Sequence, residues 1–168
     1  MTRRSLVAFL ALMTGSAIAL TSCAGADQQG SPAHRMSVWV SGTGFGEQIG
    51  TLIADNARVA KDVPNGTGAV HAACVTIVND AEMANSSLPS PDSEVTDLLT
   101  QAYGLEGVAG NQCFDAGATN TKMLAQSRRT SIRAEALYAQ VLDRIRQIDG
   151  KVVSTTTTTD NSTGGIFG

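Results

Sequence analysis

The segment 37–50, SVWVSGTGFGEQIG, places several glycines between a short apolar stretch and a helical pattern. A strand, a glycine-rich turn and a helix in that order can cradle the phosphates of a dinucleotide when the glycines follow the spacing G-x-G-x-x-G. From Gly42 the last position of the motif is Glu47, and from Gly44 it is Ile49. A carboxylate at that position would repel a pyrophosphate. The segment therefore does not predict a cofactor loop.

The other catalytic patterns are incomplete as well. His71 is the only histidine of the predicted domain, and the helical pair Glu94 and Asp97 lacks the Glu-x-x-His spacing of a di-iron bundle. The chain has no G-x-S-x-G motif for a nucleophilic serine. We therefore expect a non-enzymatic protein that holds neither a metal nor a cofactor.

One cluster of residues has the chemistry of a binding site. Four cations, Lys122, Arg128, Arg129 and Arg133, lie within twelve residues of the last helical pattern. Guanidinium groups form strong paired hydrogen bonds with phosphates and carboxylates. The cluster therefore predicts a surface for an anion, an anionic lipid head group or an acidic partner. The alternative is a solvated helix face that pairs with the acidic helices of the same domain.

The start of the chain has the features of an export signal. Arg3 and Arg4 precede an apolar run of 15 residues, LVAFLALMTGSAIAL, at positions 6–20. This run is shorter than the roughly 20 residues that cross a bilayer as a helix. A charged start followed by a short apolar run is typical of a cleaved signal peptide, which we assign to residues 1–22.

The signal ends in the sequence Leu20-Thr21-Ser22-Cys23. It resembles the lipobox of bacterial lipoproteins, a resemblance that covers residues 1–23 only. The lipobox implies that diacylglycerol is attached to the thiol of Cys23 and that the signal is removed just before it. Two acyl chains are enough for stable anchoring. The resemblance thus implies a protein outside the cytoplasm that is lipid-anchored to the cell membrane.

With Cys23 assigned to the lipid, Cys74 and Cys113 remain in a compartment where disulfides persist. A bridge between them would close a loop of about 40 residues, which stabilises a fold by about 4 kcal/mol in the chain-entropy model. The alternative is a metal site that adds His71, one helical turn before Cys74. Such a site needs further ligands, and the sequence offers none nearby. We therefore predict the disulfide.

The composition indicates one acidic domain. Without residues 1–22 the chain keeps 146 residues, with 10 Lys and Arg against 15 Asp and Glu and a formal charge of −5. This length is typical of a single domain with a sizeable core. The acidic balance argues against nucleic acid as a partner.

Apolar residues recur at helical spacing between residues 37 and 150. We expect a flexible tether over 23–36, with Val38–Val40 extended and Ser41 or Thr43 capping the first helix, and a disordered Thr-rich tail over 151–168. The predicted helices are about 45–63, 67–86, Ser90 to Cys113 and 120–148. Four helices joined by short turns predict an all-α fold, an antiparallel four-helix bundle with one disulfide.

Local signals refine the third helix. Ser90 is expected to cap it, with Pro91 at the first helical position. Glycines at 104, 107 and 110 indicate either a close helix contact or a break. In an up-down hairpin, Cys74 early in the second helix would face Cys113 late in the third, which suits the predicted disulfide.

The combined pattern of lipobox, small helical domain, two cysteines and Thr-rich tail is similar to that of cell-envelope lipoproteins of actinobacteria. It favours a membrane-anchored binding or assembly component of the envelope. The alternative is a small-ligand carrier with a cavity between its helices, and an envelope enzyme is a third possibility. A cavity that contains His71 or the arginine cluster would favour these alternatives. The candidate cavity residues are the aromatic side chains Trp39, Phe45, Tyr103 and Tyr138.

Overall fold

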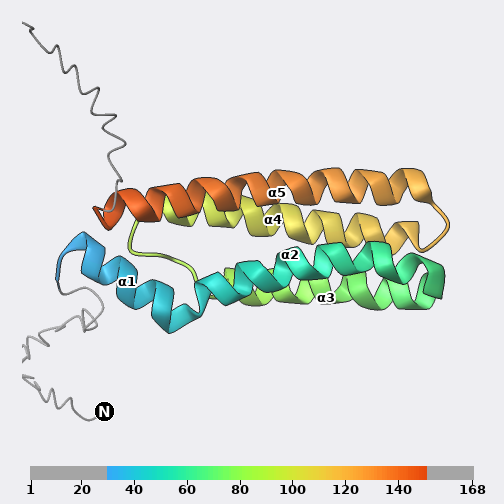
Figure 1. Cartoon of the computed structure of the whole chain (residues 1–168), viewed down its shortest axis with the longest axis horizontal. Coiled ribbons are helices and arrows are strands. Elements are labelled where there is room, and N and C mark those ends of the chain that lie inside the picture. The colour runs from blue at the N-terminus through green and yellow to red at the C-terminus, as the bar shows by residue number, and fades with distance from the viewer. Residues whose placement is uncertain (1–29, 151–168) are drawn as a thin grey trace, which may run out of the picture.

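A computed structural model describes residues 30–150 of the chain, which form five α-helices and a 3-10 turn (Figure 1). The elements are α1 Pro32–Thr43, α2 Phe45–Asp62, η2 Val63–Asn65, α3 Thr67–Asn85, α4 Ser93–Ala116 and α5 Thr121–Ile148. The predicted all-α bundle is confirmed, and its four helices are α2 to α5. The helix α1 is additional.

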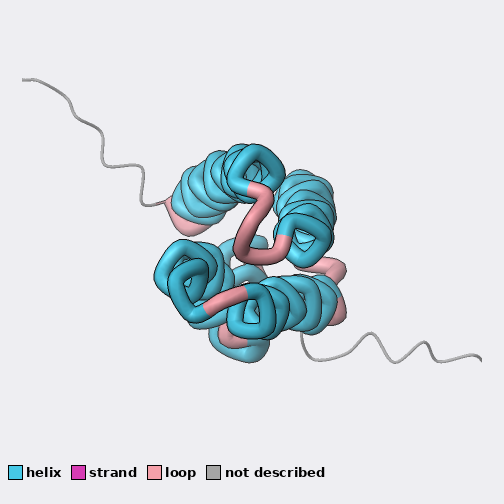
Figure 2. Tube along the Cα trace, turned by 90° about the vertical axis from the view of Figure 1, so that its right-hand side faces the viewer, coloured by secondary structure: helices cyan, strands magenta, loops and turns pink. Residues whose placement is uncertain are grey.

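The helices α2 to α5 run alternately up and down the bundle. Figure 2 looks along their axes and shows the α4–α5 pair above the α2–α3 pair. Three neighbouring pairs, α2–α3, α3–α4 and α4–α5, pack closely, whereas α2 and α5 approach each other much less. The bundle is therefore least closed along the side where α2 and α5 are neighbours.

Residues at three-and-four spacing form the core. On α2, Phe45, Ile49 and Leu52 face inward, followed by Asn56 one turn later. The main cluster also contains Ala81, Ala84, Val95, Leu99, Ala102, Tyr103, Ala134, Tyr138 and Val141. A smaller cluster surrounds the cysteines near the other end of the bundle. Burial of these stripes, rather than helix propensity, supplies most of the helical stability.

The predicted disulfide between Cys74 and Cys113 is present and buried. It joins α3 to α4 with a Cα–Cα distance of 5.6 Å, which is usual for a bridge. Gly110, one turn before Cys113, allows this approach, because a Cβ there would lie 2.6 Å from Cγ2 of Val78. The glycines of α4 do not break the helix.

The prediction for the entry to the domain is wrong, because α1 begins at Pro32 and Val38–Val40 are helical. Ser31 caps the helix, and its side chain accepts a hydrogen bond from the backbone N–H of His34. Met36 is buried in the main core. The Ser31 cap, Pro32 in the first turn and the buried Met36 together stabilise a helix in this segment. The sequence pattern had indicated a tether up to residue 36 followed by an extended segment.

Gly44, rather than a hydroxyl side chain, marks the boundary between α1 and α2. It adopts the left-handed conformation with φ 65° and is both the last cap of α1 and the first cap of α2. The hydroxyls of Ser41 and Thr43 donate to the carbonyl oxygens of Ser37 and Trp39, one turn back in α1. The predicted capping of the next helix by Ser41 or Thr43 is therefore wrong.

The cap of α4 is Asp92, so the prediction of Ser90 as the cap is wrong. Oδ1 of Asp92 accepts from the backbone N–H of Val95, while Ser90 donates its hydroxyl to the carbonyl oxygen of Asp92. Asp92 also binds the guanidinium of Arg144 at 2.8 Å, which lowers the pKa of Asp92. A side chain near the end of α5 thus holds the start of α4.

The predicted signal peptide, the lipidated Cys23, the tether up to residue 29 and the tail lie outside the described residues. Between residues 30 and 150, no helix is both long and apolar enough to cross a membrane. The disulfide is typical of proteins in compartments outside the cytoplasm.

Candidate ligand-binding cleft

The four predicted anion-binding cations lie on two sides of α5. Successive helical residues are about 100° apart, so Lys122, Arg129 and Arg133 fall within about 40° of one another on one exposed stripe. Arg128 lies on a different side, where Nη1 binds Oε1 of Glu135 at 2.6 Å. The structure therefore separates Arg128 from the other three cations.

The alternative metal site at His71 does not form. Cys74 and Cys113 are bound to each other, and the ring of His71 stacks on Phe114 with 4.1 Å between centroids. Within residues 30–150, no group of three or more His, Cys, Asp or Glu side chains is arranged to hold a metal ion.

The four aromatic residues do not line one cavity. Phe45, Tyr103 and Tyr138 are buried in the main core, where the Tyr103 and Tyr138 rings lie 6.1 Å apart. Trp39 packs against Phe45 at 5.3 Å and lines a separate groove at the α1 end. Three of the rings fill the core and the fourth lines a groove, so the four residues do not form the predicted cavity.

A cleft of about 240 Å³ lies between α2 and α5, along the least closed side of the bundle. Its walls are mostly apolar, and small side chains such as Ala60 and Ala125 leave space between the two helices. Arg128 is the only charged residue of the lining. The lining residues are Asn56, Val59, Ala60, Val63, Leu124, Ala125, Ser127 and Arg128.

Asn56 connects this cleft to a buried carboxyl group in the core. Its amide nitrogen donates to Oε2 of Glu106 at 2.8 Å and to the carbonyl oxygen of Leu52 at 2.9 Å. Ser131 donates to the same Glu106 oxygen at 3.3 Å. Because both N–H groups of Asn56 are donated away from the cleft, its amide oxygen is the acceptor that it offers to a ligand.

Glu106 is fully buried, and burial raises its pKa to about 7 despite the hydrogen bonds from Asn56 and Ser131. Within the described residues, Oε1 of Glu106 and the hydroxyls of Tyr103 and Tyr138 are buried without a hydrogen-bond partner. Burial, and next the charge of Glu106, raise the pKa of Tyr138. The centre of the bundle therefore holds a carboxyl group that is readily protonated near neutral pH.

The sequence contained a signal for this network. Asn56 and Ser131 interrupt apolar stripes at core spacing, and Glu106 lies one turn before Gly110 on the buried face of α4. Polar residues at core positions indicate buried hydrogen bonds. Their partners lie 25 to 50 residues away, which is why only the packed helices identify them.

The fold and the cleft define an all-α, disulfide-linked helical bundle with one open side. Comparison with protein-family models, with curated proteins and with solved structures finds no match for this chain.

Proposed function

We propose that this chain is a non-enzymatic binding component of a bacterial cell envelope, anchored to the membrane by diacylglycerol on Cys23. Its helical domain carries a small ligand in the cleft between α2 and α5. The ligand class that suits this cleft is a small amphiphile with an apolar body and one anionic group.

The observation that carries the ligand proposal is the composition of the cleft. Val59, Val63 and Leu124 offer apolar surface, and Arg128 offers a cation at the same site. Arg128 uses Nη1 for Glu135, and a guanidinium has five N–H donors, so further donors remain for an anion. A mostly apolar recess with a few polar groups is the usual form of a small-molecule site.

The anchor is supported by the lipobox resemblance at Leu20 to Cys23 and agrees with a disulfide in the exported part. We expect Cys23→Ser to move the protein from the membrane fraction to the soluble fraction, because no acyl chain is then attached. Detergent-phase partitioning and the intact mass of the purified chain measure this. A Cys23→Ser protein that still enters the detergent phase would contradict the anchor.

The cleft can be tested with a pair of fluorescent probes that share an apolar body. Anilinonaphthalene sulfonate is anionic, and N-phenylnaphthylamine is neutral. We expect both to bind the folded Cys23→Ser chain, and Ala125→Phe, which fills the cleft, to abolish both signals. Ala136→Phe is the matched control, since Ala136 is an exposed alanine of α5 outside the cleft lining.

Arg128→Gln tests the charge. Titration should show the anionic probe binding up to about fivefold more weakly, because a half-exposed charge pair contributes at most about 1 kcal/mol. The neutral probe should keep its affinity. Equal binding of both probes to Ala125→Phe and Ala136→Phe would place the probe site elsewhere and overturn the ligand proposal.

A further inference from the structure

The end of the bundle that carries α1 has the features of a membrane-facing surface. We propose that the bundle stands on the membrane with this end and that the groove beside α1 docks on the lipid surface. This inference rests on the proposed anchor at Cys23, and it adds an orientation and a contact that the anchor alone does not require.

The chain between the anchor and the domain is short. Ser31 caps α1, so seven residues, 24–30, separate it from Cys23. Fully extended, seven residues span at most about 25 Å. The 28 residues of α5 extend about 42 Å along the bundle. Because α1 lies at one end of the bundle (Figure 1), the anchor keeps that end close to the bilayer.

The same end of the bundle has a groove with a volume of about 410 Å³. It lies between α1 and the loop before α4 and is lined by Arg35, Val38, Trp39, Gly42, Thr43, Pro89, Ser90 and Pro91. Val38 is 36% exposed. The indole N–H of the half-buried Trp39 donates to the carbonyl oxygen of Ser87 at 3.2 Å.

The indole N–H of Trp39 therefore already has a hydrogen-bond acceptor inside the protein. The ring of Trp39 adds apolar surface to the groove. Tryptophan is enriched where proteins meet the membrane interface. A lipid surface offers apolar chains to Val38 and Trp39, and phosphate groups to Arg35. The lining of the groove thus suits the boundary between head groups and acyl chains.

Charged side chains are distributed unevenly between the two ends of the bundle. At the α1 end Arg144 binds Asp92 and Glu94 at 2.8 and 3.2 Å, and Arg146 binds Asp143 at 2.6 Å. These two arginines partly offset the charges of Asp92, Glu94 and Asp143, which would otherwise repel anionic lipids.

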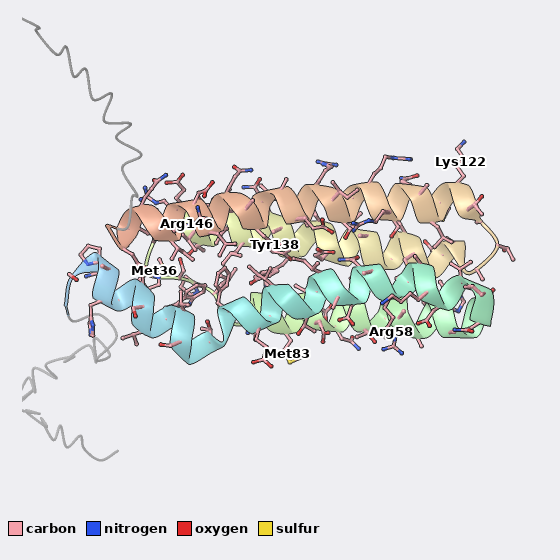
Figure 3. The ribbon with its side chains drawn as sticks, in the orientation of Figure 1. Met36, Arg58, Met83, Lys122, Tyr138 and Arg146 are labelled. Atoms are coloured by element: carbon pink, nitrogen blue, oxygen red, sulfur yellow. A yellow bond between two sulfur atoms is a disulfide. The ribbon has the colours of Figure 1, made fainter. Side chains whose placement is uncertain are left out.

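The end opposite α1 and the long exposed side of α5 carry cations without acidic partners among the described residues. Lys122, Arg129 and Arg133 are exposed and form no ion pair with other described residues. Figure 3 shows Lys122 at the end opposite Met36 and Arg146. A bundle lying flat along α5 would bring these cations to the lipid head groups, so the two orientations differ in which residues meet the bilayer.

Trp39 is the only tryptophan of the chain, so its fluorescence reports on the groove directly. The acylated protein, purified from membranes, is reconstituted into phosphatidylcholine vesicles with or without bromine on the acyl chains. We expect brominated vesicles to quench the emission of Trp39. The matched control, Trp39→Phe with Lys122→Trp, moves the tryptophan to the far end and should lose no emission.

A second measurement needs no variant of the groove. Acrylamide quenches tryptophan from the aqueous side, and it should quench the vesicle-bound acylated protein less than the free Cys23→Ser protein. This comparison stands even if the relocated tryptophan impairs folding.

The outcomes separate this inference from the proposed anchor. Vesicle-bound protein whose Trp39 is neither quenched by bromine nor shielded from acrylamide would overturn the docking and leave the anchor intact. Equal bromine quenching at positions 39 and 122 would show a bundle lying flat, which also overturns the inference. Protein that does not sediment with vesicles would overturn both proposals.

Discussion

Glu106→Gln should stabilise the folded protein by about 3 kcal/mol at pH 8 and by little at pH 4.5. The pKa of Glu106 is raised from its ordinary 4.5 to about 7 by burial. Each unit of pKa difference between the folded and unfolded states corresponds to about 1.4 kcal/mol. Gln keeps the shape of the side chain and its acceptor oxygen for Asn56 and Ser131, and it never has to ionise in the core.

The direction in which stability changes with pH depends on how many protons the folded and unfolded states bind. Between pH 4.5 and 7 the folded protein keeps the Glu106 proton while the unfolded chain has lost it. Stability therefore falls as pH rises through this window, and the loss is complete above pH 7. In the variant this loss is absent, so the difference between the two proteins grows with pH. Urea unfolding at pH 4.5, 6 and 8, followed by circular dichroism, measures the difference.

Glu82→Gln is the matched control, because Glu82 is an exposed carboxyl on α3. A surface change of this kind should alter stability by less than about 0.5 kcal/mol at each pH. Asp55, whose pKa burial and Asp80 raise to about 6, titrates in both proteins and cancels in the comparison. If the gain at pH 4.5 equalled the gain at pH 8, ionisation of Glu106 would not be its cause.

Removing the disulfide should lower the free energy of unfolding by about 4 kcal/mol. Cys74 and Cys113 are 39 residues apart in sequence. In the chain-entropy model, closing a loop of that length lowers the conformational entropy of the unfolded chain and raises its free energy by about 4 kcal/mol. Cys74→Ala with Cys113→Ala, in the Cys23→Ser background, leaves no thiol. Urea unfolding with and without a reducing agent measures the effect.

The reducing agent provides the control for this prediction. It should bring the protein with both cysteines down to a stability near that of the double alanine variant, and it should not change the variant. A native protein that keeps its full stability after reduction would show that the bridge contributes nothing. The small cluster of Val70, Cys74 and Cys113 also loses sulfur contacts in the variant. The double alanine variant should therefore be slightly less stable than the reduced protein.

Most of the helix boundaries were predictable because local signals agree with tertiary packing. The predicted helices 45–63 and 67–86 match α2 and α3 closely, since Phe45, Ile49 and Leu52 form a regular apolar stripe and Pro64 with Gly66 ends it. Residues 32–43 were missed. Val38, Trp39 and Val40 are consecutive apolar residues, and such a short run does not distinguish a strand from a helix.

The candidate cleft was predictable only in part. Arg128 was in the predicted cationic cluster, but its sequence neighbours Arg129 and Arg133 face another side of α5. Helix geometry alone separates these faces. That Arg128 and Ala125 lie opposite Val59 and Ala60 depends on how α2 and α5 pack, and these segments are more than 60 residues apart in sequence.

The sequence by itself determined the four helices of the bundle, their antiparallel arrangement and the disulfide, because each depends on local periodicity or on two cysteines with one possible pairing. The lipid anchor at Cys23 is a prediction of the same local kind. Only the tertiary structure decided that α2 and α5 leave a cleft and that α1 forms a groove at one end. It also decided that Glu106 is buried in the core beside Asn56, with a raised pKa. These features depend on contacts between distant helices, whose energies no local pattern contains.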